Sequence, residues 1–206
     1  IIVGRLVQPP TTRLEGYKVI MASRRLPPGQ KAIKKLPVLH EGSIPEFDPQ
    51  KWDFRVWGLV EKPLRFTYDE VRALPTKEVV ADVHCVDGWS VLDTRWEGVA
   101  PREILKLAGP KPEARFVLVH CDGGYTTNLP LEALLEDNVV LAWRLDGEEL
   151  SPEHGWPLRL VVPSRYFYKS AKWVRGLELL AQDRPGYWEQ RGYHWNADPW
   201  REERFA

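Results

Sequence analysis

The chain has 206 residues, of which 43% are hydrophobic and 28% charged, and its 29 lysines and arginines balance its 29 aspartates and glutamates. This is the composition of a globular protein with a core of its own. A net charge of zero excludes a general polyanion or nucleic-acid binder, because non-specific attraction to phosphate needs excess positive charge. The 10 tryptophans and 18 prolines argue against a helical bundle, since proline interrupts helices.

No apolar run reaches the roughly 18 residues that a membrane-spanning helix needs, so we expect no membrane span. The first residues, Ile1-Ile2-Val3-Gly4-Arg5, lack the charged and apolar regions of an export signal. We therefore expect a cytoplasmic protein, and a signal removed ahead of residue 1 stays an open alternative.

Residues 1–50 are predicted to form an irregular arm that packs on the domain, because prolines recur along them. The arm carries a basic cluster consisting of Arg24, Arg25, Lys31, Lys34 and Lys35. Such a cluster is typical of a solvated surface. The alternative is that part of it reaches an anionic ligand.

From residue 52 onward the pattern predicts many strands separated by short helices. Alternating or continuous apolar residues predict strands at residues 52–58, 79–86, 116–121, 139–143, 158–162 and 171–180. Helices are predicted at residues 66–74, 101–107 and 129–136. Thr67 and Glu70 form a capping box for the first helix, and Asn128 is expected to cap the third.

Short helices between many strands indicate an α+β fold with mixed β-sheets. No repeat or internal linker divides the chain, so residues 51–206 are predicted to form one domain. The aromatic tail at residues 185–206 has no regular period, and we expect it to pack across the domain surface.

The two cysteines each follow a histidine, in the pairs His84-Cys85 and His120-Cys121. A Cys2His2 zinc site is disfavoured because neighbouring residues on a strand point to opposite faces. A disulfide between the two is disfavoured in a cytosolic chain. Cys121, near the end of an apolar strand, is predicted to be a buried small hydrophobe.

Cys85 lies at a strand end before Asp87-Gly88, where functional groups are commonly displayed. A thiolate there could be a soft-metal ligand or a nucleophile. A cysteine-dependent hydrolase, which needs a histidine close in space, therefore stays a further possibility.

A loop, a strand and a second loop between residues 146 and 173 offer a histidine and several cations. These are His154, Arg159, Lys169 and Lys172. A fixed arginine fork with lysines nearby suits a phosphate group, and surface salt bridges are the alternative.

At these residues the chain resembles the sulfite oxidase fold of molybdopterin-dependent oxidoreductases, from about Trp52 to Leu180. The matching segments keep their order, namely residues 84–90, 95–99, 108–109, 122–125, 129–130, 141–142, 146–150, 154–163 and 169–173. The context of Cys85 is similar to the bacterial, haem-free branch, which includes the catalytic subunit of the methionine sulfoxide reductase system and its cytosolic relatives. The resemblance thus implies a single sulfite oxidase-like domain.

The resemblance implies a molybdenum cofactor, molybdopterin with Mo, and an enzyme that performs two-electron oxygen-atom transfer on a small substrate such as a sulfoxide or an oxyanion. It implies that the Cys85 thiolate ligates molybdenum. The residues implied to hold the pterin and its phosphate are Asp122, His154, Arg159, Ser170, Ala171 and Lys172, with Arg25 or Arg24 approaching from the arm.

The chain departs from sulfite oxidases directly after Cys85. Those enzymes carry basic residues there, whereas this chain has Asp87, Gly88, Trp89 and Ser90. Asp87 would repel sulfite, and Trp89 offers an apolar wall. Nothing in the sequence resembles a haem domain, and we expect no dimerisation domain of the family type, so we expect a separate electron-transfer partner and a monomer. The alternatives are a molybdopterin-binding protein without turnover and a sulfite-oxidising enzyme.

Overall fold

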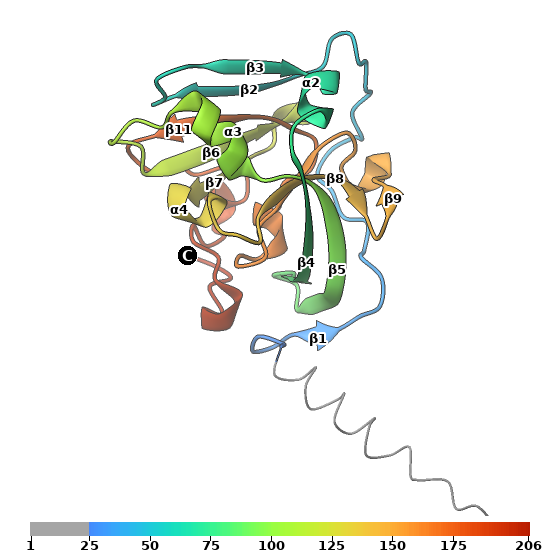
Figure 1. The fold of residues 1–206 in the computed structure, drawn as a ribbon. Helices are drawn as coiled ribbons and strands as arrows, with labels where there is room; N and C mark the ends of the chain where they lie inside the picture. The colour runs from blue at the N-terminus through green and yellow to red at the C-terminus, as the bar shows by residue number, and fades with distance from the viewer. Residues whose placement is uncertain (1–24) are drawn as a thin grey trace, which may run out of the picture.

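The computed structural model describes residues 25–206, which fold into two β-sheets with a few short helices (Figure 1). The predicted α+β class with mixed sheets is confirmed. The predictions that concern Arg24 and the first residues of the chain lie outside the described part. Among residues 25–206, no helix has the length and apolar composition that crossing a bilayer requires.

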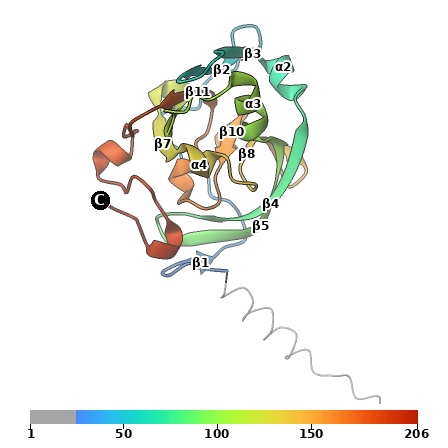
Figure 2. The same cartoon turned by 60° about the vertical axis from the view of Figure 1, so that its left-hand side comes forward.

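One sheet has six strands and contains the hairpin that ends near Cys85. Its path runs through β1 (Lys31–Ala32), β5 (Trp89–Val99), β8 (Val140–Leu145) and β10 (Arg159–Val161), with β4 (Thr76–His84) paired to β5 and β9 (Glu148–Glu149) paired to β8. The antiparallel β4–β5 hairpin extends along one side of the molecule, and β1 lies beside its tip in both views (Figures 1 and 2).

The second sheet has five strands in the order β3 (Leu64–Thr67), β2 (Asp53–Gly58), β11 (Val174–Leu180), β6 (Phe116–Cys121) and β7 (Thr126–Pro130). Its central pair, β2 and β11, is parallel although the two strands are far apart in the sequence. The other pairs are antiparallel.

The main core is shared by the two sheets. Phe54 and Leu177 from the second sheet belong to the same buried cluster as Leu141 and Leu160 from the first. Their chain neighbours Val140 and Val161 belong to a smaller cluster on the other face of the first sheet, as the two-residue period of a strand requires. The central strands of the first sheet are therefore buried on both faces.

Two of the three predicted helices are confirmed. In α2 (Tyr68–Arg72) the Thr67 hydroxyl accepts from the Glu70 amide at 3.3 Å, and the Glu70 carboxylate accepts from the Thr67 amide at 2.7 Å. The next helix, α3 (Pro101–Ala108), has proline in its first turn and ends at Gly109 with a φ of 64°, a left-handed conformation that favours glycine.

The predicted helix at residues 129–136 is much shorter and begins later. Only α4 (Leu131–Leu134) is helical, and Pro130 precedes it. Asn128 lies in strand β7 and is not a helix cap. Its buried side chain accepts from the Lys169 ammonium at 2.7 Å and donates to Asp183. These long-range partners override the local capping preference.

The longest strand, β5, is absent from the sequence prediction. Its alternation of buried and exposed residues is interrupted at Asp93, which has a φ of 57°. A shift in register interrupts the pairing with β4 between Ala81 and Val83. Such an irregularity hides a strand from a search for strict alternation.

The tail contains two short 3-10 helices, η4 (Glu189–Arg191) and η5 (Pro199–Arg201). The Tyr187 amide donates to the Thr126 carbonyl at 2.8 Å, and the Tyr166 amide donates to the Ala197 carbonyl at 2.7 Å. These bonds attach the tail to the domain, as expected for a segment that packs across its surface.

A buried carboxylate, Asp53, ties together three strands of the second sheet. It accepts from Arg55 on β2 at 2.8 Å, from Arg65 on β3 at 2.6 Å and from Arg175 on β11 at 2.8 Å. Burial works in the opposite direction, but these guanidinium groups hold the pKa of Asp53 well below its usual range.

Replacing Asp53 with Asn should therefore destabilise the protein at neutral pH by about 3 kcal/mol, because it leaves several cations without their shared partner. A carboxylate whose pKa is depressed by folding stabilises the fold above its unfolded pKa, and this contribution is lost as pH falls. Urea unfolding at neutral pH and at about pH 3 measures the free energy of unfolding of the wild type and the variant. The difference between the two proteins should be smaller in acid, and a difference that stays constant across this range would contradict the role of Asp53.

Candidate active site

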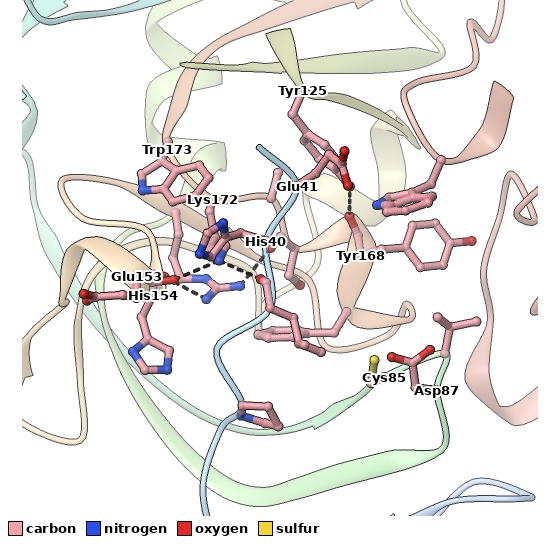
Figure 3. A pocket seen from close by; sticks show the side chains of 18 of the residues that line it. His40, Glu41, Cys85, Asp87, Tyr125, Glu153, His154, Tyr168, Lys172 and Trp173 are labelled. Atoms are coloured by element: carbon pink, nitrogen blue, oxygen red, sulfur yellow. Dashed lines mark hydrogen bonds between the residues drawn. The ribbon is translucent and has the colours of Figure 1, made fainter. Parts of the chain in front are cut away.

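A cavity of about 320 Å³ opens between the β4–β5 hairpin, the loops around β10 and the tail (Figure 3). Its size lies in the range typical of small-molecule sites. The lining residues come from five separate segments of the chain, namely residues 37–41, 85–89, 153–159, 167–173 and 188–193, together with Tyr125.

Cys85 lies directly after β4, in a tight turn that points its sulfur into the cavity (Figure 3). The Cys85 amide donates to the Trp89 carbonyl at 2.8 Å, and the Gly88 amide donates back to the Cys85 carbonyl at 3.0 Å. Gly88 has a φ of 97°, which explains the glycine at this position. Burial raises the pKa of the Cys85 thiol to about 12, so the thiolate needs a metal or a cation to form at neutral pH.

The other residues of the two His-Cys pairs are held elsewhere. The His84 ring lies on the opposite face of β4 and contacts the Ser90 hydroxyl at 2.8 Å. His120 contacts Glu178 at 2.8 Å. Cys121 is buried in the main core, as predicted, and both cysteines are free thiols. Among residues 25–206, no cluster of three or more His, Cys, Asp or Glu residues is placed to hold a metal.

Arg159 lies in the wall of the cavity and is only 3% exposed. Its terminal nitrogens donate to the carbonyls of His154 at 2.8 Å and Ser170 at 2.9 Å, while its buried Nε has no hydrogen-bond partner among residues 25–206. The guanidinium lies over the Phe167 ring at 4.6 Å. Burial lowers its pKa to about 9, which leaves it charged at neutral pH.

Lys172 adds a second cation to the same wall. Its ammonium donates to the carbonyl of Glu153 at 2.8 Å and to that of Leu39, in the arm, at 2.7 Å. Burial, and then the charge of Arg159, lower its pKa to about 7. Two close cations with only carbonyl partners make a strong site for an anion.

The structure brings six of the eight residues predicted for the site to this cavity: Cys85, His154, Arg159, Ser170, Ala171 and Lys172. The His154 ring is held between the Ser151 hydroxyl at 3.0 Å and the Leu36 carbonyl at 3.3 Å. The Ser170 hydroxyl accepts from the Val162 amide at 2.9 Å, so it anchors the loop to the end of β10.

Two residues predicted for the site do not line the cavity, because each forms an ion pair elsewhere in the fold. Arg25 forms ion pairs with Asp82 and Asp93 on the far side of the hairpin. Asp122 accepts from Arg175 at 2.8 Å and does not line the cavity. In each case an opposite charge within the fold holds the side chain away from the cavity.

Lys169 also differs from its expected role. Its side chain is fully buried and its ammonium donates to Glu189 and to the Asn128 carbonyl, at 2.9 Å to the latter. It therefore joins the loop to the tail and is not available to a phosphate.

Several residues that line the cavity were not predicted from the sequence. The tail contributes Trp188 and Tyr193, and the arm contributes His40 and Glu41. The density of aromatic residues after residue 185 was the available signal for the first pair. Nothing in the sequence pattern pointed to the second pair.

The fold and the cavity define an α+β domain with two mixed sheets whose cavity presents a cysteine and two cations. A profile described as "Oxidoreductase molybdopterin binding domain" matches residues 41–188. The chain belongs to this family, whose domain binds molybdopterin with molybdenum, and it is an oxidoreductase.

Several relatives share this domain. The chain is 47% identical over 185 residues to the uncharacterized oxidoreductase YuiH of Bacillus subtilis, covering 89% of this chain and 93% of the relative. It is 27% identical to the protein-methionine-sulfoxide reductase catalytic subunit MsrP of Campylobacter jejuni, covering 74% of this chain and 59% of that one. The crystal structure of the sulfane dehydrogenase SoxCD from Paracoccus pantotrophus matches with a TM-score of 0.64 and 27% identity, over 74% of this chain and 43% of that chain.

The low pKa of Lys172 predicts a pH-dependent affinity for anions. Sulfate should bind to the cofactor-free protein with nearly constant affinity below pH 7, and up to about tenfold more weakly at pH 8, because the ammonium loses its proton over this interval. Calorimetric titration with sulfate measures this. Lys172→Met should bind weakly at both pH values, whereas the exposed control Lys51→Met should behave like the wild type. A pH dependence that persists in Lys172→Met would contradict the assignment.

Proposed function

We propose that this protein catalyses two-electron oxygen-atom transfer to or from a small substrate, with Cys85 as the protein ligand of molybdenum. The observation that carries the proposal is the position of the Cys85 sulfur in a cavity whose opposite wall carries Arg159 and Lys172. A cofactor with both a metal–sulfur centre and a phosphate needs these two kinds of group at the two ends of one cavity.

The residues of the cavity fit the cofactor chemically. The buried Nε of Arg159 is a donor that finds no acceptor within the described part of the chain. Arg159, Lys172 and His154 would hold the phosphate end, and the backbone of Ser170 and Ala171 would lie along the pterin. When bound, molybdopterin supplies the redox-active metal and its dithiolene sulfurs.

Sulfoxide reduction is the direction that the relatives' names favour, since MsrP is named as a protein-methionine-sulfoxide reductase. The overall reaction consumes two electrons and two protons and yields a thioether and water. A separate electron-transfer partner would supply the electrons. A monomeric state and a cytoplasmic location stay predictions.

The carboxylates of the cavity support an uncharged substrate over an oxyanion. Asp87 and Glu41 both line the cavity, and Trp89, Trp188 and Tyr193 add aromatic side chains to its lining. Carboxylates repel sulfite, whereas a sulfoxide carries no net charge and packs against aromatic rings. The protein's own contribution to catalysis would be to hold the cofactor, exclude water and select the substrate.

Replacing Cys85 with Ser should abolish sulfoxide reduction while most of the cofactor stays bound, since the phosphate-holding groups are untouched. The test uses protein from a host that makes molybdopterin. It measures molybdenum per chain, pterin fluorescence after denaturation, and turnover of dimethyl sulfoxide with an artificial electron donor. Cys121→Ala, at a buried cysteine outside the cavity, is the matched control and should keep its activity. Full activity in Cys85→Ser, or wild-type protein without molybdenum from the same host, would refute the proposal.

Asp87 should determine the preference between neutral and anionic substrates. Asp87→Asn should bind sulfite roughly fivefold more tightly, as expected for the removal of ~1 kcal/mol of charge repulsion in a solvated site, and Asp87→Lys should strengthen it further. The KM for dimethyl sulfoxide should change little in both variants. Unaltered sulfite affinity in Asp87→Lys would show that this carboxylate does not select the substrate.

A further inference from the structure

The turn that presents Cys85 is supported from below by the N-terminal arm. Strand β1 runs parallel to the start of β5, with the Lys31 amide donating to the Gly88 carbonyl and the Ile33 amide to the Ser90 carbonyl, both at 2.8 Å. This pairing is visible at the tip of the hairpin (Figure 2). It places Gln30, the residue just before β1, underneath the turn.

The side chain of Gln30 is buried and makes two hydrogen bonds. Its Nε2 donates to the Cys85 carbonyl at 2.9 Å, and its Oε1 accepts from the Ser90 hydroxyl at 3.0 Å. The Ser90 oxygen also contacts Nδ1 of His84 at 2.8 Å. The residues of this network come from the arm and from both strands of the hairpin.

The donor and acceptor of each hydrogen bond in this network follow from the Cys85 carbonyl, which can only accept. A serine hydroxyl has one proton, and Ser90 gives it to Gln30, so Nδ1 of His84 must donate to Ser90. The Ser90 proton in turn holds the Gln30 amide with its nitrogen toward Cys85.

The Cys85 carbonyl therefore accepts two hydrogen bonds, one from Gln30 and one from the Gly88 amide. Two donors fix the plane of this peptide group and with it the direction of the Cys85 side chain. On the other side of the turn, Arg204 of the tail donates to the Val86 carbonyl. The turn is thus held by one side chain from the arm and one from the tail.

We propose that Gln30 is a positioning residue for Cys85, which holds the sulfur in the direction that molybdenum ligation requires. The inference rests on the proposed role of Cys85 as the metal ligand. Groups that orient a metal ligand through hydrogen bonds typically affect activity or metal affinity by roughly ten- to a hundredfold. Gln30 lies outside the segment matched by the family profile, residues 41–188, so the family match does not assign it.

The test compares Gln30→Glu and Gln30→Met with the wild type. Glutamate keeps the shape of the side chain but replaces the donor to the Cys85 carbonyl with an acceptor, and methionine removes both bonds. Gln190→Met is the matched control, because the Gln190 amide also donates to a backbone carbonyl, that of Pro185 at 2.9 Å, away from the cavity.

Two readouts report on the sulfur itself. In cofactor-free protein, the rate at which iodoacetamide alkylates Cys85, mapped by mass spectrometry, should rise severalfold in both Gln30 variants. In the holoenzyme, the g-values of the Mo(V) electron paramagnetic resonance signal should shift, and kcat should fall roughly tenfold or more. Gln190→Met should leave all three unchanged.

A purely structural role of Gln30 would lower the unfolding temperature but leave the Mo(V) signal and the alkylation rate as in the wild type, and that result would overturn the proposal. Ser90→Ala, which removes only the hydroxyl that orients the amide, provides a second variant if the Gln30 variants do not fold. It should shift both readouts in the same direction. Alkylation needs no molybdenum, so a failure to bind the cofactor would count against the proposed function alone.

Discussion

A buried guanidinium without a carboxylate partner is the interaction on which the site depends. Within the described residues, Arg159 is capped by two backbone carbonyls, and its Nε has no partner. Desolvating a cation costs several kcal/mol unless it is paired. The loops on either side of β10 therefore surround a charge with which an anionic cofactor would pair. Lys172 would attract the same anion.

Cys85 and its neighbour His84 lie on opposite faces of the β4–β5 hairpin. Strand geometry sends neighbouring side chains to opposite faces, so Cys85 enters the cavity while His84 turns to the buried network of Ser90 and Gln30. One face thus presents Cys85 to the cavity, and the other face holds His84 in a hydrogen-bond network. The two residues of the His-Cys sequence pair therefore do not point to the same place.

A buried ion pair between Lys169 and Glu189 joins the tail to the loop at residues 167–173. The pair lies beside β7, where the Asn128 carbonyl accepts from Lys169 and the Thr127 hydroxyl donates to Glu189. Breaking such a pair leaves an uncompensated charge in the interior, so the pair ties the loop to the tail. Trp188 and Tyr193 on the tail line the same cavity as the cations Arg159 and Lys172.

The sequence by itself determined the class of the fold and two of the three helices, because local capping signals and ordered motifs carry that information. Of the eight site residues that it predicted, the structure places six along the cavity, and their roles stay predictions. Only the tertiary structure decided the partners of the charged residues. Arg25, Asp122 and Lys169 each pair with an opposite charge from another segment of the chain, in Asp82, Arg175 and Glu189. Spacing along the chain does not encode such pairs, since they form only when the segments that carry them meet. The support of Cys85 by Gln30 has the same origin, because a parallel pairing of β1 with β5 joins residues almost 60 positions apart.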